Sequence, residues 1–172
     1  MEAAEHDYGQ TVSIDAEAIG RPGQRRFRLV ARSATACAAI WMEKQQLASI
    51  GDWLVEMLKR LDDERPPPEP EVEPLPPTEA FDLSFRASQI ALGFAEEANL
   101  FAIQAFEEQR AGDSDDPTFR CFIGRGQARA LSRKIEAVVS AGRRLCPLCD
   151  QPIDPEGHVC PRSNGHHTGA AV

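Results

Sequence analysis

The stretch QQLASIGDWLVEMLKRLD, residues 45–62, carries the strongest structural pattern in the chain. Its apolar residues recur at intervals of three or four positions: Ile50, Leu54, Met57, Leu58 and Leu61. This spacing places side chains on one face of an α-helix. The stretch therefore predicts an amphipathic helix whose apolar face covers a sheet.

A second stretch repeats the pattern 81 positions later, before Gly142, which is typical of a helix end. The shift pairs four apolar and two polar positions: Ile50 with Leu131, Leu54 with Ile135, Met57 with Val138, Leu58 with Val139, Lys44 with Arg125 and Gln46 with Gln127. We interpret this correspondence as an internal duplication. The alternative is that two unrelated amphipathic helices have been aligned, because any two such helices share a period.

Short alternating or β-branched runs precede each helix. They predict strands over 11–19, 26–32 and 36–42 in the first half, and over 81–86, 89–94, 100–106 and 118–123 in the second. The acidic stretch 109–116 has the composition of a hairpin loop. The expected fold class is α+β, with two similar halves, each an antiparallel strand meander followed by a helix.

A proline-rich stretch separates the halves. Seven of the 13 prolines lie in PPPEPEVEPLPP, residues 66–77, a composition that cannot bury a core and favours extended backbone. The expected organisation is a first half over 1–64, a spacer over 65–79, a second half over 80–144 and a tail over 145–172.

The composition is that of a soluble protein. Acidic side chains outnumber basic ones by 27 to 19, giving a net charge of −8, and 42% of the residues are hydrophobic. There is no run of eighteen apolar residues, and the first ten residues are acidic and polar, unlike a signal peptide. We therefore expect a cytoplasmic protein without a membrane segment.

The tail has the side chains of a zinc site. Four suitable ligands fall within fifteen residues: Cys146, Cys149, His158 and Cys160. Zinc in structural sites takes four tetrahedral nitrogen or sulfur ligands, and a Cys-x-x-Cys turn presents two thiolates together. His166 and His167 are alternatives to His158 as the fourth ligand. The pattern predicts one structural zinc ion.

Two other interpretations of the cysteines are less favoured. A thioredoxin-like redox pair opens a helix after a strand, whereas Cys146 follows a helix end. A catalytic zinc site pairs the metal with a carboxylate base, or with His-x-Glu in deaminases, and the tail lacks both patterns. Cys37 and Cys121 lie in apolar runs and are expected to be small core residues.

Four segments resemble a family of bacterial proteins catalogued as domain of unknown function 3090 and also called a repeat protein. They are GRPGQRRF at 20–27, MEKQQLA at 42–48, AVVSAGRRLCPLC at 137–149 and the tail CPLCDQPIDPEGHVCPRSNG at 146–165. The family pattern carries over to the four tail ligands and to Gln46 and Gln127. This chain departs from it in the long spacer and in Asp150, where relatives usually have glycine. The resemblance implies the fold and the metal site, but no activity.

The two expected helix starts carry matching polar residues. Lys44 and Gln46 begin the first helix, and Arg125, Gln127 and Arg129 begin the second. Free amide groups at a helix start bind anions readily, so these residues are candidates for a ligand site. The alternative is that each glutamine caps its own helix and the basic residues form a solvated face.

No nucleophile–base pair, catalytic metal motif or phosphate-binding loop is recognisable. We therefore expect a zinc-stabilised binding or scaffold module for an anionic ligand or a partner protein. One alternative is an enzyme or accessory protein acting on a phosphorylated small molecule. Another is a nucleic-acid binder using the basic tail, which is disfavoured by the acidic pI of about 5.0 and by the shortage of exposed aromatic residues near basic ones.

Overall fold

The computed structural model describes residues 4–21, 24–64, 80–107 and 116–141. In the tail it also describes residues 148, 149, 153, 160 and 162. The predicted spacer, most of the predicted loop at 109–116 and most of the tail lie outside these residues.

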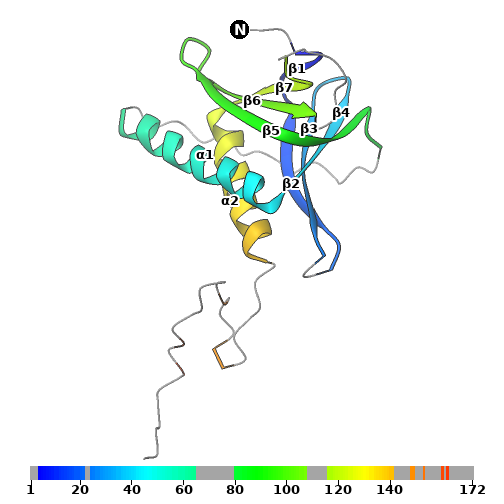
Figure 1. The fold of residues 1–172 in the computed structure, drawn as a ribbon. Coiled ribbons are helices and arrows are strands. Elements are labelled where there is room, and N and C mark those ends of the chain that lie inside the picture. Colours follow the sequence, from blue (N-terminus) through cyan, green and yellow to red (C-terminus); the bar gives the residue numbers. More distant parts are fainter. Residues whose placement is uncertain are drawn as a thin grey trace, which may run out of the picture.

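In the described residues, seven strands and two helices follow one another along the chain (Figure 1). They are β1 (His6–Gln10), β2 (Ser13–Ile19), β3 (Arg26–Arg32), β4 (Cys37–Met42), α1 (Lys44–Glu64), β5 (Leu83–Ala95), β6 (Leu100–Glu107), β7 (Phe119–Ile123) and α2 (Arg125–Ser140). The α+β class is therefore confirmed. The stretches predicted separately at 81–86 and 89–94 form the single strand β5, and β1 was not predicted because its sequence, HDYGQ, is polar.

The strands form one mixed sheet in the order β1-β7-β6-β5-β4-β3-β2. The predicted antiparallel meanders are present within the two halves, but the halves join in one mixed sheet, because β4 pairs with β5 in parallel and β1 pairs with β7 in parallel. The physical reason is the crossover: a parallel pair needs a long connection between its strands, and α1 lies in the chain between β4 and β5. The strands β2-β3-β4 and β5-β6-β7 are antiparallel.

In two long extended stretches of the chain, the first part pairs with one neighbouring strand and the second part pairs with another. In β5, residues 83–86 pair with β4 and residues 87–95 pair with β6. At the N-terminus, β1 pairs with β7 and β2 pairs with β3, with only Thr11 and Val12 between them. Because β1 and β2 are the two end strands of the sheet yet adjacent in sequence, the sheet curls until its ends meet.

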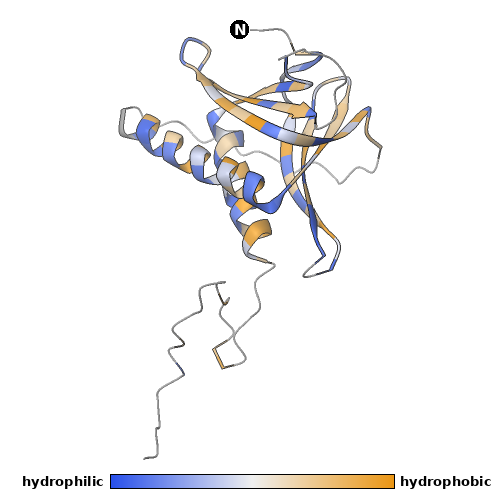
Figure 2. Ribbon diagram, viewed as in Figure 1, coloured by the Kyte–Doolittle hydropathy of each residue, from blue (hydrophilic) through white to orange (hydrophobic). Residues whose placement is uncertain are grey.

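The two helices pack together on one side of this curled sheet (Figure 1). Five apolar positions of the two predicted helical faces are buried: Ile50, Leu54, Leu58, Leu131 and Ile135. Ile50 and Leu131 are each only 1% exposed, whereas the remaining positions are partly buried against the core. The buried helix residues join side chains from β2 to β7 in one cluster of the described residues, which includes Phe101 and Ile40, and Tyr8 of β1 packs against it. Figure 2 shows the hydrophilic residues interspersed along both helices, as expected for amphipathic helices packed on a core. None of the described helices is long and apolar enough to span a membrane.

Candidate functional site

Gln46, at the start of α1, uses both ends of its side-chain amide within the fold. Its Oε1 accepts a hydrogen bond from the backbone N–H of Glu43 at 2.8 Å, which caps the helix. Its Nε2 donates to the carbonyl oxygen of Ser88 at 3.0 Å. Ser88 lies where β5 changes partners from β4 to β6 and the register is irregular. Gln46 therefore satisfies a carbonyl group that the sheet leaves unpaired.

Gln127 makes the corresponding contacts at the start of α2. Its Oε1 accepts a hydrogen bond from the backbone N–H of Gly124 at 3.1 Å. Its Nε2 donates to the carbonyl oxygens of Thr11 at 3.0 Å and Val12 at 3.2 Å. These two residues form the junction between β1 and β2. Both predicted glutamines are thus engaged in capping a helix and holding a strand junction.

Arg125 and Arg129 also bind groups of the protein itself. The Nε of Arg125 donates to Oδ1 of Asn99 at 2.9 Å, and its guanidinium also reaches the carbonyl oxygen of Leu61 at 3.4 Å. Arg129 binds the Asp62 carboxylate through two hydrogen bonds of 3.0 and 3.2 Å. Because Leu61 and Asp62 lie in the last turns of α1, these arginines fasten the start of α2 to the end of α1.

The two helix starts do not form one site. The start of α2 lies at the end of α1, so Lys44 and Arg125 are separated by most of the length of α1, about 25 Å at 1.5 Å per residue. Lys44 is half-buried and makes no ion pair with the described residues. A small ligand therefore does not contact both.

The predicted metal ligands lie largely outside the described residues. Cys149 and Cys160 are described, whereas Cys146 and His158 are not. In the described part of the chain, no three His, Cys, Asp or Glu side chains are grouped as metal ligands. Cys121 is fully buried, which raises the pKa of its thiol far above the usual range and makes it unreactive. It is a core residue, as predicted, while Cys37 is half-buried.

A row of four side chains across β2, β3, β4 and β5 was not predicted. Glu17 pairs with Arg28, Arg28 with Trp41, and Trp41 with Arg86. We call these four residues the Trp41 row. Side chains directly opposite one another on neighbouring strands point to the same face of the sheet. The sequence indicated few exposed aromatic residues near basic ones, and here a half-buried tryptophan lies between two arginines.

The Trp41 side chain is held by its neighbours. Its Nε1 donates to Oγ of Ser84 at 3.2 Å, and the guanidinium carbons of Arg26 and Arg28 lie 4.7 and 5.1 Å from its ring centroid. Arg28 is itself fixed by Glu17, since its Nε donates to Oε2 at 2.7 Å. The indole ring is therefore preorganised beside two cationic groups.

A pocket of about 350 Å³ adjoins this ring, which we call the Trp41 pocket. Its lining residues are Arg25, Arg26, Phe27, Trp41, Met42, Glu43 and Arg86. Glu43 and Arg86 form an ion pair at 2.6 Å. Neither Arg25 nor Arg26 has a carboxylate partner among the described residues. Arg26, whose guanidinium carbon lies 4.7 Å from the Trp41 ring centroid, is therefore available to an anion, and Arg25 also lines the pocket.

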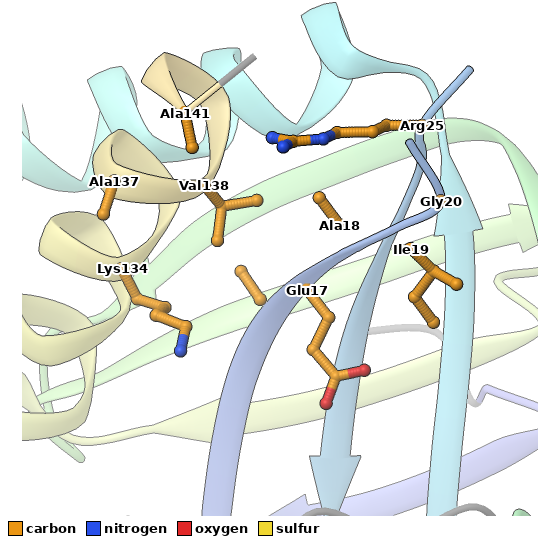
Figure 3. Close-up of a pocket in the computed structure, with 10 residues that line it drawn as sticks. Glu17, Ala18, Ile19, Gly20, Arg25, Lys134, Ala137, Val138 and Ala141 are labelled. Atoms are coloured by element: carbon orange, nitrogen blue, oxygen red, sulfur yellow. The ribbon is translucent and has the colours of Figure 1, made fainter. Parts of the chain in front are cut away.

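A second pocket, of about 480 Å³, lies between the end of β2 and the end of α2 (Figure 3). Its walls carry mainly small apolar side chains, such as Ala18, Ala137 and Val138. Figure 3 shows the Arg25 side chain extending from the β2–β3 connection toward α2. Arg25 lines both pockets, whereas Lys134 in the second one lies 3.8 Å from the Asp15 carboxylate.

A family described as "Protein of unknown function (DUF3090)" matches residues 6–160. The chain belongs to this family. The match begins at the first residue of β1 and ends at Cys160, so it covers the described sheet and both helices. No curated protein and no solved structure matches the chain. The family description names no activity, so we infer the function from the geometry of the described residues.

Part of the Trp41 site was detectable in the sequence. The stretch RFRLVAR at 26–32 alternates, which puts Arg26 and Arg28 on one face of a strand. Pairing with the next predicted strand then brings an aromatic residue within reach of that face. The approach of Arg86 was not detectable, because it depends on the parallel pairing of β4 with β5.

Proposed function

We propose that this DUF3090 member is a non-enzymatic binding module that recognises an anionic ligand in the Trp41 pocket. The observation that carries the proposal is Arg26, which has no carboxylate partner in the described residues and lies beside a preorganised indole ring, in a pocket that Arg25 also lines. Guanidinium groups bind phosphate and carboxylate through paired hydrogen bonds. The residues at the two helix starts support this role indirectly, because their hydrogen bonds stabilise the sheet that forms the pocket.

We also propose that the two halves are an internal repeat. Ile50 and Leu131, and Leu54 and Ile135, are buried alike, and Gln46 and Gln127 make corresponding contacts. The order of strand pairing is also the same. The first half runs β2-β3-β4 and then pairs in parallel with β5, and the second runs from the later part of β5 through β6 and β7 and then pairs in parallel with β1.

The repeat offers an internal comparison for the Trp41 row. In the second half, the corresponding row consists of Gly93, Ala102, Phe122 and Gln10. Phe122 lies 81 positions after Trp41, yet its row contains no charged side chain. The same arrangement of strands therefore forms with no arginine in the row itself, although the guanidinium carbon of Arg120 lies 5.5 Å from the Phe122 ring centroid.

We also propose that the tail holds a structural zinc ion. Cys146, Cys149, His158 and Cys160 have the spacing of a zinc knuckle, and the family match ends at the last of them. The match excludes His166 and His167, which favours His158 as the fourth ligand. We propose that the metal closes the tail into a compact unit attached to the end of α2.

The proposal is tested by thermal unfolding with inorganic pyrophosphate, inorganic phosphate and citrate at constant ionic strength. A ligand that binds only the folded state raises Tm with its concentration. We expect at least one of these anions to raise Tm for the natural chain, and Arg25→Ala/Arg26→Ala to abolish the rise.

A matched control removes the same charge elsewhere. Lys59 and Arg60 are exposed on α1, and neither lines the Trp41 pocket. The variant Lys59→Ala/Arg60→Ala is expected to keep the full rise in Tm. If both double variants lose the rise in Tm equally, the effect depends only on net charge, and the Trp41 pocket is not the binding site.

A further inference from the structure

We propose that the ligand of the Trp41 pocket is a nucleoside phosphate, with its phosphate bound by Arg26 at the pocket wall that Arg25 also lines, and its base packed against Trp41. This inference rests on the proposed function and adds the chemical class of the ligand. It follows from the combination of groups in the pocket, because cations, an aromatic ring and a carboxylate line the same space.

The aromatic ring is the first part of the argument. A site for a simple anion needs only donors and positive charge, whereas this one also contains an indole ring. The bond from Trp41 to Ser84 fixes the ring, and the ion pair between Arg28 and Glu17 fixes a guanidinium beside it. Bases stack on aromatic rings and on guanidinium planes. A preorganised ring lowers the entropy lost when a base packs against it.

The carboxylate is the second part of the argument. Glu43 lines the same pocket, and its side chain remains 68% exposed although it pairs with Arg86. A carboxylate repels a ligand made only of phosphate groups, but it accepts hydrogen bonds from hydroxyl or amino groups. A ligand that carries both a phosphate and a sugar or base donor satisfies Glu43 and the arginines together.

Size and net charge favour a single nucleotide over a nucleic-acid strand. A volume of about 350 Å³ is at the lower end of the range of small-molecule pockets, roughly 300–1,000 Å³. A strand binds along a continuous basic surface, and its affinity depends on many phosphate contacts. The chain has a net charge of −8. Two aromatic rings line the Trp41 pocket, but Phe27 is only 7% exposed and belongs to the core, so Trp41 is the ring available for stacking. These properties suit a ligand that makes one stacking contact.

The test uses the fluorescence of Trp41. The chain has two tryptophans, and Trp53 packs edge-on against Phe101, with ring centroids 5.9 Å apart. Trp53→Phe keeps an aromatic ring there and leaves Trp41 as the only tryptophan. This variant is titrated with AMP, GMP, CMP and UMP, and with ribose 5-phosphate and adenosine as partial ligands.

We expect at least one nucleotide to quench the fluorescence with a Kd about tenfold or more below the Kd values of ribose 5-phosphate and adenosine, because only the nucleotide uses both the ring and the arginines. Arg25→Ala/Arg26→Ala is expected to weaken nucleotide binding at least about tenfold, and Lys59→Ala/Arg60→Ala to leave it unchanged. In proton spectra, upfield shifts of the base resonances provide a second readout, which Trp41→Phe preserves and Trp41→Leu removes.

The two levels of the proposal fail differently. If ribose 5-phosphate binds as tightly as every nucleotide, base recognition is wrong while anion binding stands. If neither the nucleotides nor pyrophosphate binds, both proposals are wrong. If a ten-residue oligoadenylate binds more than about tenfold tighter than AMP, the nucleotide class is replaced by a nucleic-acid strand.

Discussion

Gly51 on α1 and Ile135 on α2 are in contact where the two helices cross. A Cβ atom at Gly51 would lie 2.8 Å from Cγ2 of Ile135, closer than packed carbon atoms approach. Ile135 is 2% exposed and belongs to the core. The absence of a side chain at Gly51 therefore sets how closely the helices pack.

Gly51→Ala is expected to lower the free energy of unfolding by about 1 kcal/mol, because an overpacking cost of about 1–3 kcal/mol exceeds the helix-propensity gain of about 1 kcal/mol. Urea unfolding measures the change. In the background of Ile135→Ala, which removes Cγ2, the same substitution should become stabilising. If Gly51→Ala is destabilising by the same amount in both backgrounds, the contact with Ile135 does not explain the glycine.

Gln127→Ala is expected to lower the free energy of unfolding by about 1–3 kcal/mol. The substitution removes the hydrogen bond from the Gly124 N–H that caps α2, and it leaves the carbonyl oxygens of Thr11 and Val12 without their donor. Gln45→Ala, at an exposed position on α1, is the control and should change stability by less than about 0.5 kcal/mol. Equal effects of the two substitutions would mean that Gln127 does not hold the β1–β2 junction.

The basic residues at the two helix starts are expected to differ in their effect on stability. Arg125→Ala should cost about 1 kcal/mol, because it removes hydrogen bonds to Asn99 and Leu61. Lys44→Ala should cost less than about 0.5 kcal/mol, since Lys44 has no partner among the described residues. If Arg125→Ala leaves stability unchanged but weakens anion binding, the helix start is a ligand site, and the fastening role is wrong.

Asp7 is expected to make part of the stability dependent on pH. The hydrogen bond from Arg120 holds the pKa of this carboxyl group below its ordinary value of 3.8, although partial burial opposes the shift. A pKa lowered by folding gives a contribution that is present above 3.8 and is lost as the pH falls through the lower folded value. Urea unfolding at pH values from 7 down to 2 should therefore show a shallower acid loss in Asp7→Asn than in the natural chain.

Asp52→Asn serves as the control for that measurement, because Asp52 is exposed on α1 and has no partner among the described residues. It is expected to leave the acid loss unchanged. A profile for Asp7→Asn that parallels the natural chain at every pH would contradict the role of the contact between β1 and β7.

Metal removal is expected to act on the tail alone. Protein purified without chelators should contain one zinc ion per chain, and Cys149→Ser should lose it with little change in the Tm of the sheet and helices. His158→Ala should weaken zinc binding strongly, while His166→Ala/His167→Ala should not. Metal content well below one equivalent in the natural chain would refute the site. If His166→Ala/His167→Ala weakens zinc binding and His158→Ala does not, the fourth ligand is His166 or His167.

The sequence by itself determined the helices and most of the strands. The apolar positions of residues 45–62 and 131–139 repeat at intervals of three and four, and the burial of Ile50 and Leu131 agrees with that pattern. Such patterns are local, because each side chain's direction depends only on the backbone of its own element. The polar strand β1 escaped prediction because its partner, β7, lies over a hundred residues away.

The tertiary structure alone decided which residues meet. Trp41 and Arg86 are 45 residues apart, and they become neighbours only because β5 pairs with β4 in parallel. The second contact of Gln127, with Thr11 and Val12, depends likewise on the curl of the sheet. Strand order and register are set by the packing of one shared core, whose free energy depends on all the elements together, so no single stretch of sequence determines them.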